Sequence, residues 1–142
     1  MVQIDITYEG SLRTRATHGP SGTTLVTDAP VDNHGRGESF SPTDLVATAL
    51  GSCMLTIMGI VAERDGIDLT GARVRVTKGM VAQPTRRIGR LQVEIDVPVD
   101  PGDVGRTKLE RAALTCPVHK SLLGDVEIPV LWRFGAEAVQ PS

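Results

Sequence analysis

The chain has 142 residues, of which 40% are hydrophobic and 3% aromatic, and its formal net charge is −2. This length suits one domain over residues 1–142 with a mainly aliphatic core. Basic residues are scattered and do not alternate with aromatic ones, which argues against nucleic-acid binding. The N-terminal sequence MVQIDITYEG has neither a cationic segment nor a long apolar one. It is not typical of a signal peptide, so we expect a cytoplasmic protein.

The first part of the chain has the alternating pattern of β-strands. Residues 2–8 and 11–17 predict two strands joined by a turn at Glu9-Gly10, which together form a hairpin. Residues 23–28 predict a third strand. The next segment, APVDNHGRGESF, is rich in Gly, Pro and polar residues and therefore predicts a loop.

A long apolar segment after this loop predicts a helix over residues 41–63. Ser41 is a suitable N-cap, Pro42 suits the first helical position, and Asp44 completes a variant of the capping box. Gly66 is expected to terminate the helix. A helix this long with so few charges is expected to be buried on most of its surface. Its Thr, Ser and Gly residues and its capping signals favour a helix of a soluble domain, so we expect no membrane partner.

The second half of the chain predicts two alternating strands, two helices and a final strand. These elements cover residues 72–82, 88–98, 103–115, 117–124 and 126–134, and residues 135–142 are expected to form a loose tail. The predicted order is therefore β-β-β-α-β-β-α-α-β, which is typical of an α+β fold.

The two cysteines, Cys53 and Cys116, have different predicted surroundings. Cys53 lies about three turns into the long helix, beyond the reach of the helix dipole, so a thiolate there would need positive charge from elsewhere. Cys116 precedes Pro117 in an N-cap-like position, where backbone N–H groups favour a thiolate. Free cysteine also commonly packs as a small hydrophobic residue, so the residues alone leave both interpretations open.

The sequence Cys-Pro-Val-His contains two residue types that bind metals, Cys116 and His119. A structural zinc site usually has four protein ligands, and this segment supplies two. We therefore expect no metal site and no bound cofactor.

Two segments carry a family resemblance, SPTDLVATALGSCM at residues 41–54 and TCPVHKSL at residues 115–122. Together with the order of the predicted elements, they resemble the OsmC/Ohr family of peroxide-handling proteins. The resemblance implies an OsmC-like fold with a long buried central helix. It also implies an intertwined homodimer with two sites at the subunit interface.

The resemblance further implies a cysteine-based peroxidase that reduces organic hydroperoxides and serves in oxidative-stress defence. Cys53 matches the cysteine that attacks the peroxide and becomes a sulfenic acid, and Cys116 matches the cysteine that converts it to a disulfide. An external dithiol of the lipoyl type or similar would then reduce the disulfide. An apolar pocket would favour organic hydroperoxides. Its candidate walls are Leu45, Leu50, Met54, Ile57 and Met58.

The arginine that supports the thiolate in this family most nearly matches Arg36, in the loop before the long helix. Some members use an arginine of the second strand, where Arg13 and Arg15 are expected to share one face. The residues alone do not decide among these three arginines.

The acidic partner of the arginine falls near Asp44, with Glu38 as a rival. In one helix, nine residues place Asp44 on the opposite side from Cys53 and about 13 Å along the axis. Asp44 could therefore act on Cys53 only through an arginine or across a dimer interface. Its alternative role is helix capping.

Two functions follow from these observations. The first is the thiol peroxidase that the resemblance implies. The second is a non-enzymatic domain that binds a small molecule or a protein partner, in which both cysteines are structural.

Overall fold

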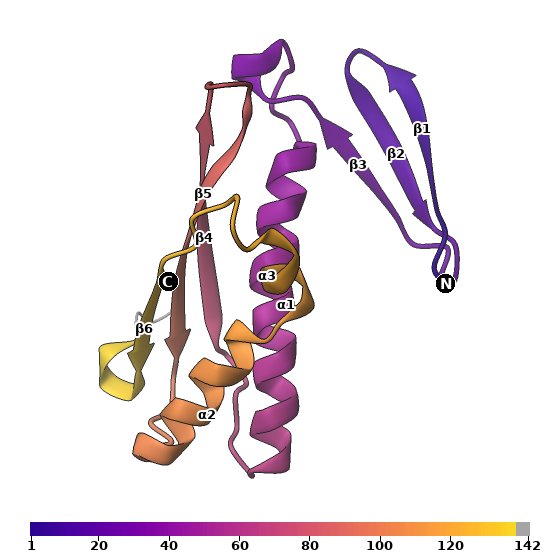
Figure 1. Cartoon of the computed structure of the whole chain (residues 1–142). Helices are drawn as coiled ribbons and strands as arrows, with labels where there is room; N and C mark the ends of the chain where they lie inside the picture. Colours follow the sequence, from indigo (N-terminus) through magenta and orange to yellow (C-terminus); the bar gives the residue numbers. More distant parts are fainter. Residues whose placement is uncertain (139–142) are drawn as a thin grey trace. The chain divides into compact units, whose positions relative to one another are not determined.

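The computed structural model describes residues 1–138 of the chain. Contacts divide it into two compact units, Met1–Val46 and the described residues from Ala47 onwards. Figure 1 shows the elements in the order β1-β2-β3-α1-β4-β5-α2-α3-β6, with short 3-10 turns after β3 and β6. The predicted α+β order is confirmed.

The first unit contains an antiparallel sheet of β1 (Ile4–Gly10), β2 (Arg13–His18) and β3 (Thr24–Asp28) in the order β1-β2-β3. The hairpin turn lies at Ser11 and Leu12, whose φ angles are 54° and 62°. The predicted turn at Glu9-Gly10 is therefore wrong. Gly10 belongs to β1, at an irregularity in the β1–β2 register, and its φ of 87° suits a glycine.

The register separates the two faces of this sheet by chemistry. Ile6 pairs with Ala16, which pairs with Leu25, so these apolar side chains share one face. Arg13, which pairs with Asp28, lies on the other face. The apolar face remains in solvent in the described chain. Its exposed members are Ile4 (56%), Ile6 (65%), Tyr8 (64%) and Leu25 (45%).

A loop that includes the 3-10 turn Val31–Asn33 leads from β3 to α1 (Pro42–Arg64). The predicted capping box is confirmed in both directions. The Asp44 N–H donates to Ser41 Oγ over 3.1 Å, and the Ser41 N–H donates to Asp44 Oδ2 over 2.9 Å. Gly66 follows the helix with a φ of 69°, as expected of a C-terminal glycine.

By length and composition alone, α1 could cross a membrane. A core helix of a soluble protein passes the same test, so this property carries little weight.

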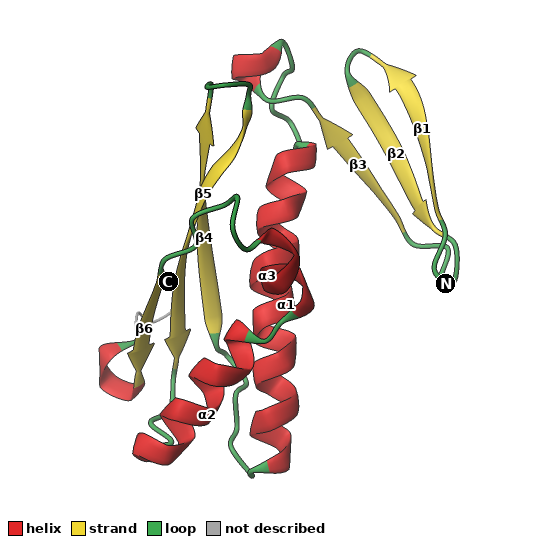
Figure 2. Cartoon of the chain, viewed as in Figure 1, coloured by secondary structure: helices red, strands yellow, loops and turns green. Residues whose placement is uncertain are grey.

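The second unit contains a mixed sheet in the order β4-β5-β6. The strand β4 (Arg73–Val81) is antiparallel to β5 (Arg87–Val97), which is parallel to β6 (Val130–Phe134). The helices α2 (Gly102–Leu114) and α3 (Pro117–Leu122) connect β5 to β6. Figure 2 shows these helices and the second unit's part of α1 on one side of the sheet.

The core of this unit lies between the sheet and α1. A methyl group added at Gly51 would approach side-chain carbons of Val74 and Val76 to 3.1 Å, so the glycine allows α1 to pack closely on β4. The fully buried apolar side chains on the two elements are Leu50, Met54 and Met58 on α1 and Leu91, Val93, Ile95 and Val97 on β5. The other face of β5 is polar, where Glu94 and Asp96 both pair with Arg133 of β6.

The C-terminal part differs from the expectation in two places. The strand predicted over residues 126–134 begins only at Val130, and Glu127 makes an isolated bridge with Arg90. The segment predicted as a loose tail begins with a 3-10 turn at Gly135–Glu137. Residues 139–142 of that tail lie outside the described residues.

Candidate redox site

The fold of the second unit brings the two cysteines together. Cys53 lies in α1 and is half-buried, whereas Cys116 at the start of α3 is fully buried. Both are free thiols, and Cys53 lies close enough to Cys116 to raise the pKa of the Cys116 thiol. The two cysteines are far apart in sequence, but α2 returns the chain to α1 before α3 begins, and this brings Cys116 to Cys53.

Cys116 is the N-cap of α3, as the sequence predicts. Its Sγ accepts a hydrogen bond from the backbone N–H of His119 over 3.2 Å. The backbone N–H groups at this position favour a thiolate, as expected, but a second effect opposes them. Burial raises the pKa of the Cys116 thiol, and this effect outweighs the lowering by the His119 N–H, while the neighbouring Cys53 raises the pKa further. Cys116 is therefore held as a neutral thiol.

His119 is also buried, with 7% of its surface exposed. Its Nδ1 atom is buried and has no hydrogen-bond partner among the described residues. Burial lowers the pKa of His119, and the neighbouring charge of Lys120 lowers it further, so the imidazole is neutral near pH 7. Within residues 1–138, no three His, Cys, Asp or Glu side chains are grouped so that they could hold a metal ion.

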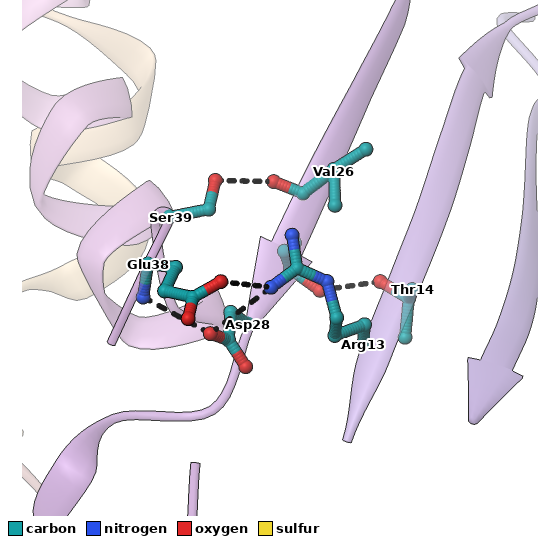
Figure 3. A network of polar contacts seen from close by, with 7 residues as sticks. Arg13, Thr14, Val26, Asp28, Glu38 and Ser39 are labelled. Carbon is teal, nitrogen blue, oxygen red and sulfur yellow. Dashed lines mark hydrogen bonds and ion pairs between the residues drawn. The ribbon is translucent and has the colours of Figure 1, made fainter. Parts of the chain in front are cut away.

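A polar network in the first unit holds Arg13 in place (Figure 3). Its Nη1 atom lies 3.3 Å from Asp28 Oδ2 and 3.3 Å from Glu38 Oε2. The Glu38 N–H donates to the same Asp28 oxygen over 3.0 Å. Asp28 is fully buried, so this ion pair is more shielded from solvent than a surface pair. The guanidinium is thus fixed by two carboxylates at the junction of β3 and the following loop.

The two other candidate arginines have looser surroundings. Arg15 pairs with Glu9 over 3.1 Å, and both side chains are more than one third exposed (49% and 38%). Arg36 is exposed in the loop after β3 and makes no ion pair with any of residues 1–138. The rival acid Glu38 contacts Arg13, whereas Asp44 bonds to the backbone of Ser41. The structure therefore brings Glu38 to one of the three arginines.

The candidate pocket walls divide into two groups. Leu50, Met54 and Met58 are fully buried, which makes them part of the core of the second unit. Leu45 and Ile57 are half-buried.

Sequence reasoning missed the role of Asp28. This residue ends a strand and carries no motif of its own, and only the pairing of Arg13 with Asp28 across β2 and β3 identifies it. Its remaining oxygen, Oδ1, is buried without a hydrogen-bond partner among the described residues.

Comparison with known proteins places these observations in a family. A model of the OsmC-like protein family matches residues 35–130. A solved structure from Psychrobacter arcticus, provisionally named an osmotic stress induced and detoxification response protein, is 46% identical, with 94% of this chain and 96% of that chain covered and a TM-score of 0.88. No curated protein sequence matches the chain.

More distant solved structures share the fold. The organic hydroperoxide resistance protein OsmC from Legionella pneumophila is 15% identical, with 93% of this chain and 96% of that chain covered and a TM-score of 0.76. An organic hydroperoxide resistance protein from Elizabethkingia anophelis is 15% identical, with 94% and 96% covered and a TM-score of 0.73.

The raised pKa of Cys116 predicts how stability depends on pH. The unfolded chain releases the thiol proton at its ordinary pKa of about 8.5, whereas the folded chain retains it. The free energy of unfolding should therefore fall as pH rises above about 8.5, and Cys116→Ala should show a shallower fall. Urea unfolding of the reduced proteins between pH 7 and pH 10 measures both slopes. Equal slopes would contradict the burial of a neutral thiol.

Proposed function

The chain belongs to the OsmC-like protein family, and we propose that it is a thiol-dependent peroxidase that reduces organic hydroperoxides to alcohols. The observation that carries this proposal is the neighbouring pair of free thiols, one half-buried and one buried. A catalytic thiol must meet a peroxide, and a second thiol must reach the oxidised sulfur before further oxidation. Paired thiols of unequal exposure satisfy both requirements.

In the first step, the Cys53 thiolate attacks one peroxide oxygen and the O–O bond breaks. The other oxygen takes up a proton and leaves as an alcohol, which leaves Cys53 as a sulfenic acid. In the second step, the Cys116 sulfur attacks the Cys53 sulfur. An S–S bond forms, the S–O bond breaks, and the oxygen leaves as water with the thiol proton. An external dithiol, of the lipoyl type or similar, then reduces the disulfide by exchange.

The difference in burial supports this division of roles. Cys53 is the more accessible sulfur, so an incoming hydroperoxide meets it first. Cys116 is fully buried, and the raised pKa of its thiol keeps it neutral and less reactive toward peroxide. Disulfide formation in the cytoplasm is typically transient and catalytic, which suits a cytoplasmic enzyme of oxidative-stress defence.

For the positive group that supports the thiolate, we place Arg13 ahead of Arg36. The sequence resemblance points to Arg36, but Arg13 is the arginine that Asp28 and Glu38 fix in one geometry. A preorganised donor stabilises a developing charge better than a mobile one, because it needs no reorganisation during the reaction.

We propose that the protein is a homodimer in which a second copy covers the apolar face of the β1-β2-β3 sheet. Monomeric soluble proteins rarely expose contiguous large apolar patches. Ile4, Ile6 and Tyr8 project from one edge strand, and each is more than half exposed. Because β1 is also an edge strand with unpaired backbone groups, an uncovered β1 would favour aggregation, and a specific partner surface would prevent it.

The first prediction of this proposal concerns Cys53. Cys53→Ser should abolish consumption of cumene hydroperoxide in the presence of a dithiol, and wild type should consume cumene hydroperoxide faster than hydrogen peroxide. Cys116→Ser should complete one turnover and then stop, with Cys53 in over-oxidised forms that mass spectrometry detects. If Cys53→Ser and wild type consume peroxide equally, the peroxidase assignment fails and the binding-domain alternative stands.

The second prediction separates the arginines. Arg13→Gln should lower kcat/KM for cumene hydroperoxide by about a hundredfold, because it removes a fixed electrostatic donor. Arg15→Gln is the matched control on the same strand face and should remain near wild type. Folded protein is verified by circular dichroism before each assay. A larger loss in Arg36→Gln than in Arg13→Gln would assign the role to Arg36.

The third prediction tests the dimer by sedimentation velocity. Wild type should sediment with twice the chain mass of 15.1 kDa, whereas Ile6→Asp should sediment as a monomer because it places a charge on the apolar face. Thr7→Asp is the matched control, since Thr7 lies on the opposite face and pairs with Arg15. Sedimentation of wild type as a monomer would refute the proposed interface.

A further inference from the structure

The buried imidazole of His119 has no role in the reaction described above. Its Nδ1 atom is buried without a hydrogen-bond partner among the described residues, although the side chain is only 7% exposed. An unsatisfied buried polar atom costs about 1–3 kcal/mol, so a histidine in this position needs an explanation. A bound metal ion does not explain it, because no three His, Cys, Asp or Glu side chains of residues 1–138 are grouped so that they could hold one.

The position of His119 ties it to the second thiol. His119 lies on the first turn of α3, and its backbone N–H donates to Cys116 Sγ over 3.2 Å. The side chains of Cys116 and His119 therefore both belong to the first turn of α3 and its N-cap. In the reduced state Nδ1 carries no competing hydrogen bond from residues 1–138.

The chemistry of disulfide formation requires a proton acceptor at this place. Cys116 must lose its thiol proton when its sulfur attacks the sulfenic acid, yet burial raises the pKa of that thiol. The charged or titratable groups that act on the thiol or the imidazole are Cys53 on α1 and Lys120 on α3. Neither suits the task, because Cys53 is the reaction partner and the cationic Lys120 holds its proton at neutral pH.

We infer that the His119 imidazole accepts the proton of the Cys116 thiol during disulfide formation. The Cys116 sulfur forms the S–S bond to Cys53, and the thiol proton moves to the imidazole. The S–O bond of the sulfenic acid breaks, and the leaving hydroxide takes up the proton as water. When an external dithiol reduces the disulfide, one proton of the dithiol passes to the imidazole, and the imidazolium gives it to the Cys116 sulfur as the S–S bond breaks. This inference rests on the proposed function in its peroxide step only.

A single-turnover experiment tests this role. Reduced wild type and His119→Gln are mixed with one equivalent of cumene hydroperoxide and quenched at intervals with dimedone and an alkylating agent. Intact mass then separates the sulfenic acid, the free thiols and the disulfide. In His119→Gln, Cys53 should be oxidised at the wild-type rate, whereas the disulfide should form about a hundredfold more slowly. Equal rates of disulfide formation in the two proteins would overturn the inference.

The pH profile of wild type gives a second readout that a packing role would not change. The rate of disulfide formation should rise with pH while the imidazole loses its proton. Because the pKa of His119 lies below the ordinary histidine value of about 6.5, the rate should level off near neutral pH. Lys120→Gln should move this step to higher pH, because it removes the charge that lowers the pKa of His119. A wild-type rate that rises steadily up to alkaline pH, with no plateau, would overturn the inference even if His119→Gln does not fold.

Oxidation by diamide makes the test independent of the peroxidase proposal. Diamide activates the accessible thiol without peroxide, and the second thiol then forms the disulfide. If wild type does not react with cumene hydroperoxide, the proposed function fails. The diamide reaction still tests whether His119 speeds disulfide formation. A slower disulfide step in His119→Gln with diamide would support the inference, and an unchanged step would overturn it.

Discussion

The contact between the Cys53 and Cys116 thiols depends on how α1 packs in the second unit. Gly51, two residues before Cys53, allows α1 to approach Val74 and Val76 of β4. Leu50 and Met54 are buried beside it, which fixes the rotation of the helix and leaves Cys53 half-buried. The start of α3 then meets the helix at Cys116. Small changes in this packing would separate the sulfur atoms, because close-packed interiors transmit strain.

The surroundings of Cys116 combine opposing electrostatic effects. The N-cap position supplies a backbone N–H, which favours a thiolate, whereas full burial disfavours any charge. Burial is the larger effect, so the buried sulfur of Cys116 stays protonated, whereas Cys53 is the more accessible of the two thiols. A protonated thiol needs a base before it can act as a nucleophile. The neutral His119 is the base that we propose for this step.

The first unit organises charge in a different way. Arg13 is held by the fully buried Asp28 and by the exposed Glu38, so its guanidinium has one shielded and one solvated partner. The opposite face of the same sheet is apolar and exposed. This three-stranded sheet therefore carries an ion-paired arginine on one face and exposed apolar side chains on the other.

The sequence by itself determined the order of the elements and the ends of α1. Apolar periodicity, the Ser41–Asp44 capping box and Gly66 are local signals, and local signals can be interpreted without tertiary contacts. It failed at the hairpin turn, because Gly10 marks a bulge and the positive φ angles fall on Ser11 and Leu12. Only the tertiary structure decided that Asp28 pairs with Arg13, since that depends on strand register, and that the Cys116 thiol stays neutral, since that depends on burial. Burial and register are properties of elements packed together, and no residue pattern within one element specifies them.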